Sequence, residues 1–119
     1  MNRKKINFLA ISRASAKAAD DKKGEDILLL NVKRFSNYAD YLLIVTAGSS
    51  PQMIAISENI KKIVQNTFGM IPLHREGKHS DSWAVIDYGG LIVHIMTFEA
   101  RNFYRIENLV EKARRITFR

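Results

Sequence analysis

The chain has 119 residues, enough for one domain with its own hydrophobic core, and its 46% hydrophobic content is ordinary for a globular protein. It contains no cysteine, which excludes disulfides, thiolate catalysis and thiolate metal sites. This composition fits a reducing compartment, and we expect the protein to act in the cytoplasm. The net charge is +7, with +5 on residues 1–23, +4 on residues 101–119 and −2 on residues 24–100. The basic segments at the two ends of the chain suit a protein that lies beside RNA, but they do not predict one that recognises a specific RNA sequence.

The first part of the chain predicts a helix followed by two strands. Residues 6–22 form the predicted helix, and Gly24 is its expected C-terminal stop. The apolar runs at residues 27–32 and 41–47 alternate little with polar residues. Such runs are typical of strands that are covered on both faces.

A second helix is predicted immediately after these strands. Gly48, Ser49, Ser50 and Pro51 open it, because serine caps a helix and proline is tolerated in the first turn. Gly69 is its predicted end, and residues 71–75 then form a short strand candidate that Pro72 restricts to a sheet edge. The apolar face of this helix consists of Met53, Ile56, Ile60, Ile63, Val64 and Thr67.

The last part of the chain predicts a hairpin and a helix. Apolar runs at residues 83–86 and 91–96 flank residues 87–90, whose two glycines supply the positive φ of a tight turn. The hydrophobic period then becomes helical, which predicts one helix over residues 99–116 that buries Phe103, Ile106, Val110 and Ala113. The predicted order α-β-β-α-β-β-β-α indicates a single α/β domain with a mixed sheet flanked by helices.

The sequence contains residues that could be taken for a phosphate-binding site or for a metal site. Gly48 and Ser49 stand where nucleotidyltransferases bind phosphate, but those enzymes also need paired carboxylates to hold metal ions, and no such pair follows. A helix cap is the favoured interpretation. The five metal-ligand types in the second half, His74, His79, His94, Asp81 and Asp87, match no ligand spacing. We therefore predict no enzymatic activity, no metal and no cofactor, and interpret His94 as a hydrogen-bonded structural residue.

The strand at residues 83–87 carries the strongest binding signal. Alternation places Trp83 and Asp87 on one face and Tyr88 on the opposite face. An exposed tryptophan beside a carboxylate is typical of a protein interface, and Glu76 and Asp81 would add acidic charge nearby. The alternative is that Trp83 packs beneath the last helix. The residues alone favour neither.

A collinear series over residues 22–110 resembles the ribosomal silencing factor family, also called Iojap-like proteins. The series includes Lys23, Gly24, Glu25, Asp26, Ile27, Ser36, Asp40, Tyr41, Ser49, Gln52, Glu76, Gly77, Trp83, Asp87, Tyr88, His94, Arg101, Phe103, Tyr104 and Glu107.

The resemblance implies one domain over residues 1–119 with basic extensions at 1–21 and 111–119. It also implies a nucleotidyltransferase-like sheet without the catalytic carboxylates. A protein of this kind binds the large ribosomal subunit through ribosomal protein fourteen, blocks joining of the small subunit sterically, and represses translation during starvation. The alternative is an RNA-binding module that acts in large-subunit assembly through its basic ends.

The same resemblance assigns residues to the docking surface and to its support. We expect a monomer or weak homodimer with no membrane contact, in which the basic ends make at most peripheral contact with ribosomal RNA. The implied docking residues are Trp83, Asp87, Tyr88, Glu76 and Asp81, and the structural residues are His94, Tyr104 and Gly89.

Overall fold

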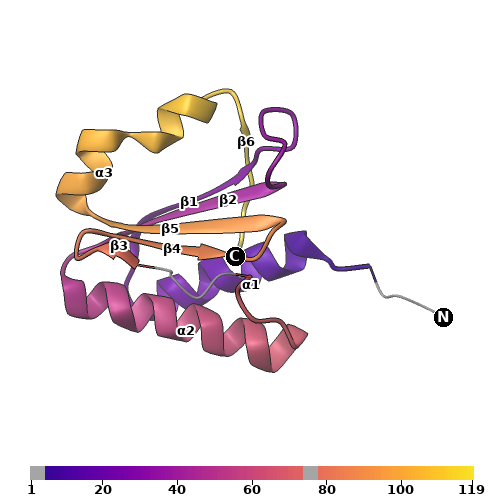
Figure 1. Cartoon of the computed structure of the whole chain (residues 1–119), viewed down its shortest axis with the longest axis horizontal. Coiled ribbons are helices and arrows are strands. Elements are labelled where there is room, and N and C mark those ends of the chain that lie inside the picture. Colours follow the sequence, from indigo (N-terminus) through magenta and orange to yellow (C-terminus); the bar gives the residue numbers. More distant parts are fainter. Residues whose placement is uncertain (1–4, 74–77) are drawn as a thin grey trace.

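A computed structural model describes residues 5–73 and 78–119. The elements are α1 (Phe8–Asp21), β1 (Glu25–Asn31), β2 (Tyr41–Ala47), α2 (Ser50–Phe68), β3 (Lys78–Ser80), β4 (Trp83–Asp87), β5 (Leu91–Thr97), α3 (Phe98–Tyr104), the 3-10 helix η1 (Ile106–Val110) and β6 (Arg114–Arg115) (Figure 1).

Within these residues the strands form one six-stranded sheet in the order β3-β4-β5-β2-β1-β6. The central strands β2 and β5 are parallel, with Tyr41 opposite Leu91 and Ala47 opposite Thr97. All other neighbouring strands are antiparallel. The sheet is therefore mixed, as the sequence predicts, and β6 is an additional edge strand that the sequence does not predict.

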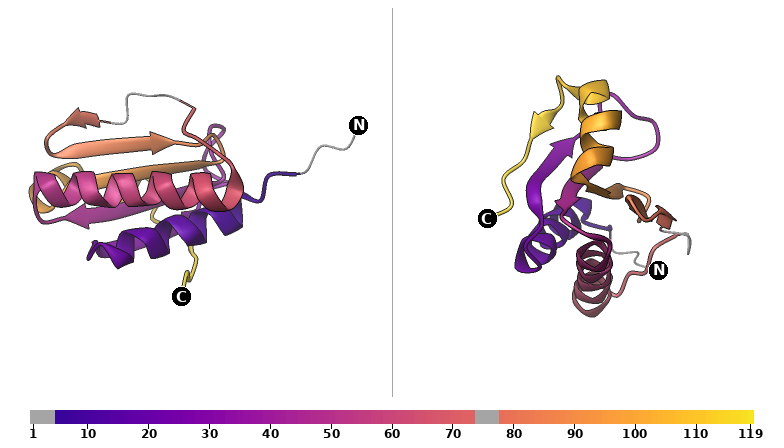
Figure 2. Two further views of the ribbon diagram at one scale, coloured as in Figure 1. Left: turned by 90° about the horizontal axis from the view of Figure 1, so that it is seen from below. Right: turned by 90° about the vertical axis from the view of Figure 1, so that its left-hand side faces the viewer.

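The sheet is covered on both faces, but unequally. Helices α1 and α2 lie on one face, and α3 with η1 lies on the other (Figure 2). Alternate residues of the central strands, such as Leu43 and Val93, pack toward α1 and α2 in the main core. Their neighbours Ile44 and Met96 pack toward α3 in a smaller cluster that includes Ala100. The smaller cover leaves part of the second face accessible.

The two long helices lie within two residues of their predicted positions, but Gly24 does not end the first helix. The Ser49 hydroxyl accepts a hydrogen bond from the Gln52 N–H at 3.2 Å, and Gly69 ends α2 in the left-handed conformation. Helix α1 ends at Asp21 with Lys22 as its C-cap, and Gly24 lies two residues beyond this cap. A Cβ on Gly24 would lie 2.7 Å from a methyl carbon of Val45, so close packing explains this glycine.

The strand predicted at residues 71–75 is wrong where it can be assessed. Residues 71–73 form no strand, and residues 74–75 lie outside the described residues. The edge strand is instead β3, which pairs with β4. The Leu73 N–H donates to the Asp87 carbonyl at 2.7 Å, which joins this segment to the end of β4.

The single helix predicted at residues 99–116 is also wrong. Arg105 adopts a left-handed conformation with φ 45° and ends α3, and the chain continues as η1 and then β6. This path lets the Ile116 N–H donate to the Leu29 carbonyl at 2.9 Å and packs Ile116 against the main core. Phe103, predicted as buried, is 79% exposed because the short helix turns it outward.

Candidate protein-docking site

The β4–β5 hairpin separates its side chains as the sequence predicts. Trp83 and Asp87 are partly buried on the α3 face of the sheet, whereas Ala84 and Ile86 are buried on the other face. Gly89 has φ 90° in the turn, and its N–H donates to the Asp87 carboxylate at 2.8 Å. The turn therefore depends both on a glycine and on an acceptor at position 87.

Tyr88 requires a correction to the expected docking surface. Its side chain is 1% exposed in the core beneath α1 and α2, and its hydroxyl has no hydrogen-bond partner among the residues of the structure. Burial raises the pKa of the phenol from 10.0 to about 12. A side chain in this position supports the hairpin from beneath and cannot contact a partner.

Trp83 lies beneath α3 and remains partly exposed, so both interpretations of the sequence hold in part. Its indole N–H donates to Nδ1 of His94 at 2.9 Å, which is the hydrogen bond that the sequence predicts for this histidine. The Tyr104 ring lies against the indole with centroids 5.0 Å apart. Phe103 meets Tyr104 edge to face at 4.9 Å. The indole is thus held rigidly within an aromatic cluster that reaches the surface.

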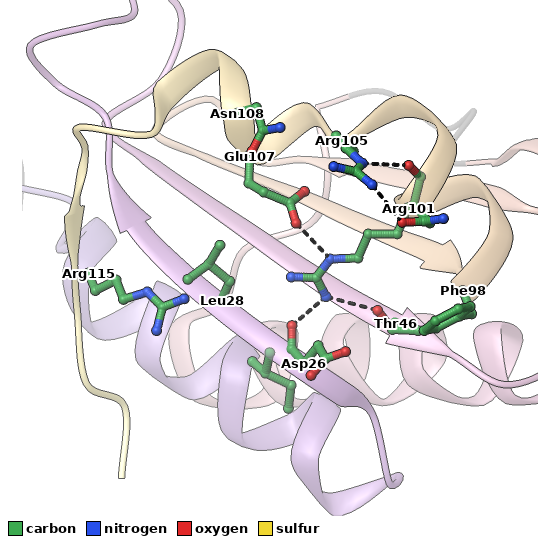
Figure 3. Close-up of a pocket in the computed structure, with 11 residues that line it drawn as sticks. Asp26, Leu28, Thr46, Phe98, Arg101, Arg105, Glu107, Asn108 and Arg115 are labelled. Carbon is green, nitrogen blue, oxygen red and sulfur yellow. Dashed lines mark hydrogen bonds and ion pairs between the residues drawn. The ribbon is translucent and has the colours of Figure 1, made fainter.

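Arg101 fixes α3 over the sheet and so positions this cluster (Figure 3). Its guanidinium donates to the Thr46 hydroxyl at 2.8 Å, to the Asp26 carbonyl, and to the Glu107 carboxylate at 3.3 Å. The Arg101 side chain is 12% exposed. One cation therefore joins α3, η1, β1 and β2. The sequence marks Arg101 and Glu107 as motif residues but does not predict this network.

The face beside this network contains a pocket of about 500 Å³. Figure 3 shows it between β1, α3, η1 and β6, with Arg105 and Arg115 at its sides and Asp26 and Glu107 in its lining. Within residues 5–73 and 78–119, no three His, Asp or Glu side chains are grouped so that they could hold a metal ion.

Four exposed apolar side chains extend the surface beyond Trp83. They all belong to α3 and η1: Phe98 is 63% exposed, Phe103 79%, Tyr104 54% and Leu109 83%. The sequence predicts Phe103 in the core because its helical period continues past Tyr104, and it gives no signal for exposure of Phe98 or Leu109. Adjacent aromatic residues at 103 and 104 were the available signal, since both cannot face inward on one short helix.

The acidic residues expected near Trp83 are placed differently. Asp87 lies at the hairpin turn, and Asp81 is exposed in the turn before Trp83. The Asp81 carbonyl accepts a hydrogen bond from the Ser50 hydroxyl at 3.0 Å, which ties this turn to the start of α2. Glu76 lies outside the described residues. The structure therefore shows Trp83 with Tyr104 and His94 as one cluster, with Asp81 in the turn before β4 and Asp87 at the end of β4.

None of the helices in the described part of the chain is long and apolar enough to cross a membrane.

Comparison with known proteins gives the family. The family model described as "Ribosomal silencing factor during starvation" matches residues 5–119, which include both basic ends.

Individual relatives agree with this match. The chain is 39% identical over 94 residues to the ribosomal silencing factor RsfS of Haemophilus influenzae, covering 76% of this chain and 87% of that protein. It is 35% identical over 104 residues to RsfS of Bacillus subtilis, covering 87% of each. A crystal structure of a Chromobacterium violaceum protein superposes with a TM-score of 0.81 at 27% identity, covering 87% of this chain and 86% of that one. These proteins form a non-catalytic, ribosome-associated family that silences translation, and the chain belongs to it as a ribosomal silencing factor.

Proposed function

We propose that the chain binds the large ribosomal subunit through ribosomal protein fourteen and sterically blocks joining of the small subunit in the cytoplasm. The observation that carries this proposal is the partly exposed Trp83, which His94 and Tyr104 hold in one orientation. Aromatic anchors that are already rigid lose little conformational entropy on binding and often dominate the binding energy.

The residues around Trp83 suit a protein partner. We define the β4–α3 surface as Trp83, Asp87, Phe103 and Tyr104, together with Asp81 in the preceding turn. Its aromatic side chains supply apolar area, and its two carboxylates favour a basic partner. Tyr88 is excluded because it is buried.

The size of the protein supports a steric mechanism. Its principal extents are 47, 31 and 27 Å. Subunits that join make close contacts, so a protein at least 27 Å thick at their interface would hold the surrounding surfaces apart. Repression in this scheme needs no catalysis and no conformational signal. It needs only occupancy of the interface.

Asp87 offers a direct test of the electrostatic part. Asp87→Asn removes the charge and keeps an oxygen that can accept the Gly89 N–H, so the turn should persist. Asp87→Lys reverses the charge and should place like charges together on a basic partner. It also removes the acceptor of the Gly89 N–H, so thermal melting must first establish that this variant is folded. Asp21→Lys is a matched control, because it makes the same charge change at an exposed position on α1.

The measurement is binding to purified ribosomal protein fourteen by biolayer interferometry. We expect affinity to fall a few-fold for Asp87→Asn and more than tenfold for Asp87→Lys, the equivalent of at least about 1.4 kcal/mol. The affinity of Asp21→Lys should stay within twofold of wild type. Equal losses in the two lysine variants would mean that net charge, and not the β4–α3 surface, governs binding. Wild-type protein that failed to bind ribosomal protein fourteen would refute the proposed partner.

A further inference from the structure

The basic residues from the two ends of the chain meet at one edge of the sheet. β6 pairs with β1, with Arg114 opposite Asn31 and Arg115 opposite Leu30. The Arg13 side chain on α1 donates to the Thr117 carbonyl at 3.0 Å, although 104 positions separate the two residues. Figure 2 shows the C-terminal segment running beside α1. Helix α1 and the C-terminal residues 114–119, which belong to the two basic segments of the sequence, are therefore neighbours in the fold.

This surface is anchored and does not behave as a free tail. Ile116 and Phe118 pack against the main core. The Arg119 guanidinium contacts the Asp20 carboxylate at 3.3 Å. We define the basic ridge by six exposed cationic residues of α1 and of the C-terminal segment, which are Arg13, Lys17, Lys112, Arg114, Arg115 and Arg119.

Most of the charge on the basic ridge is available to a ligand. In the described part of the chain, Lys17, Lys112, Arg114 and Arg115 form no ion pair. The acidic groups beside them are Asp20, which pairs with Arg119, and Glu111, which precedes Lys112. Asp26 and Glu107 line the same pocket as Arg115, and Glu107 pairs with Arg101. The ridge therefore keeps a clear positive excess, and two of its free cations are adjacent arginines on a strand.

We propose that the basic ridge binds the phosphate backbone of RNA. Arginine donates two parallel hydrogen bonds to phosphate, and the release of counterions from RNA favours such contacts. Phe118 packs inward, so this edge presents no aromatic platform for stacking bases. The ridge should accordingly recognise RNA by its backbone and not by its sequence.

The position of the basic ridge allows it to act together with a protein contact. In the sheet order, three strands separate β6 from β4, so the two lie about 19 Å apart at the usual strand spacing of about 4.8 Å. RNA at the β6 edge would leave the β4–α3 surface open. The proposal does not rest on the identity of the protein partner.

The test compares two double variants that lose the same charge. Arg114→Ala/Arg115→Ala removes two cations from the ridge and leaves the backbone pairing of β6 possible, whereas Lys61→Ala/Lys62→Ala removes two cations from α2. Binding of the full chain to a fluorescent RNA hairpin of arbitrary sequence is measured over a range of KCl concentrations. Thermal melting by circular dichroism establishes that both variants are folded.

The slope of log K against log[KCl] is negative, and we expect its magnitude to fall by about two for the ridge variant, about one for each lost phosphate contact. The slope should stay unchanged for the α2 variant. Affinity of the ridge variant at low salt should fall at least roughly tenfold. Equal losses in both variants, or tight binding of polyglutamate in place of RNA, would overturn the proposal. In the first case the arginines would serve only to keep the sheet edge from pairing with other chains. The assay contains no ribosomal protein, so its outcome is independent of the docking proposal.

Discussion

Substitutions of Trp83 separate its structural role from its proposed binding role. Trp83→Phe keeps an aromatic ring beside Tyr104 but removes the N–H that donates to His94. Loss of one partly buried hydrogen bond costs about 1 kcal/mol of unfolding free energy. In a chain of 119 residues this lowers the melting temperature by about 4 °C.

Trp83→Ala removes the whole ring from the smaller cluster on the α3 face. Truncation of a buried aromatic residue lowers the unfolding free energy by about 3–5 kcal/mol. Because Trp83 is partly exposed, we expect a loss near the lower end of this range, which would lower the melting temperature by about 12 °C. The variant should still be folded at 20 °C, and its affinity should be measured there.

The two variants should differ much more in binding than in stability. The indole N–H already donates to His94, so a partner would contact mainly the ring. We expect Trp83→Phe to bind the large subunit within a few-fold of wild type, and Trp83→Ala to bind at least about thirtyfold more weakly, the equivalent of about 2 kcal/mol. Circular dichroism gives the melting temperatures, and biolayer interferometry on immobilised subunits gives the affinities. A folded Trp83→Ala protein with wild-type affinity would refute the assignment of Trp83 as the anchor.

Three further predictions test other parts of the structure. Arg101→Met should lower the unfolding free energy measured in urea by about 3 kcal/mol, because it leaves the Glu107 carboxylate partly buried without its cation. Adding Glu107→Gln to this variant should recover about half of the lost stability. If it recovered none, the two residues would not be a coupled pair. The Tyr88 phenol ionises near pH 10 in the unfolded chain but only near pH 12 in the fold, so wild-type stability should fall across that window by on the order of 2–3 kcal/mol more than that of Tyr88→Phe. If the unfolding free energies of wild type and Tyr88→Phe fell equally between pH 10 and pH 12, this prediction would be contradicted. Finally, the protein with nucleoside triphosphates and Mg²⁺ should show no turnover, since Ser49 caps α2 and no carboxylate pair follows it in the sequence. Turnover that disappeared in Ser49→Ala would be contrary evidence.

The sequence was sufficient where local and tertiary preferences agree. The start of α2 at Ser49 and its end at Gly69 follow from capping and from a glycine that tolerates positive φ. The two faces of β4 follow from alternation, and the near-continuous apolar run of β2 predicts a strand covered on both sides. These features depend on residues that are close together in the chain.

The sequence was insufficient where a non-local contact decides the structure. The helical period continues past Tyr104, and nothing in it marks Arg105 as the residue that turns left-handed. The break becomes favourable because Ile116 and Phe118 then reach the core and β6 pairs with β1. The burial of Tyr88 has a similar origin, since alternation assigns its face but not the depth of cover that α1 and α2 provide.

The most direct test of the central claim is sedimentation of purified ribosomal subunits through a sucrose gradient, with and without the protein, under ionic conditions that favour joining. We predict that the protein migrates with the large subunit alone and that the peak of joined ribosomes declines as protein is added, with Trp83→Ala ineffective at the same concentration. Migration of the protein with joined ribosomes or with the small subunit, with no loss of the joined peak, would contradict a steric block at the subunit interface.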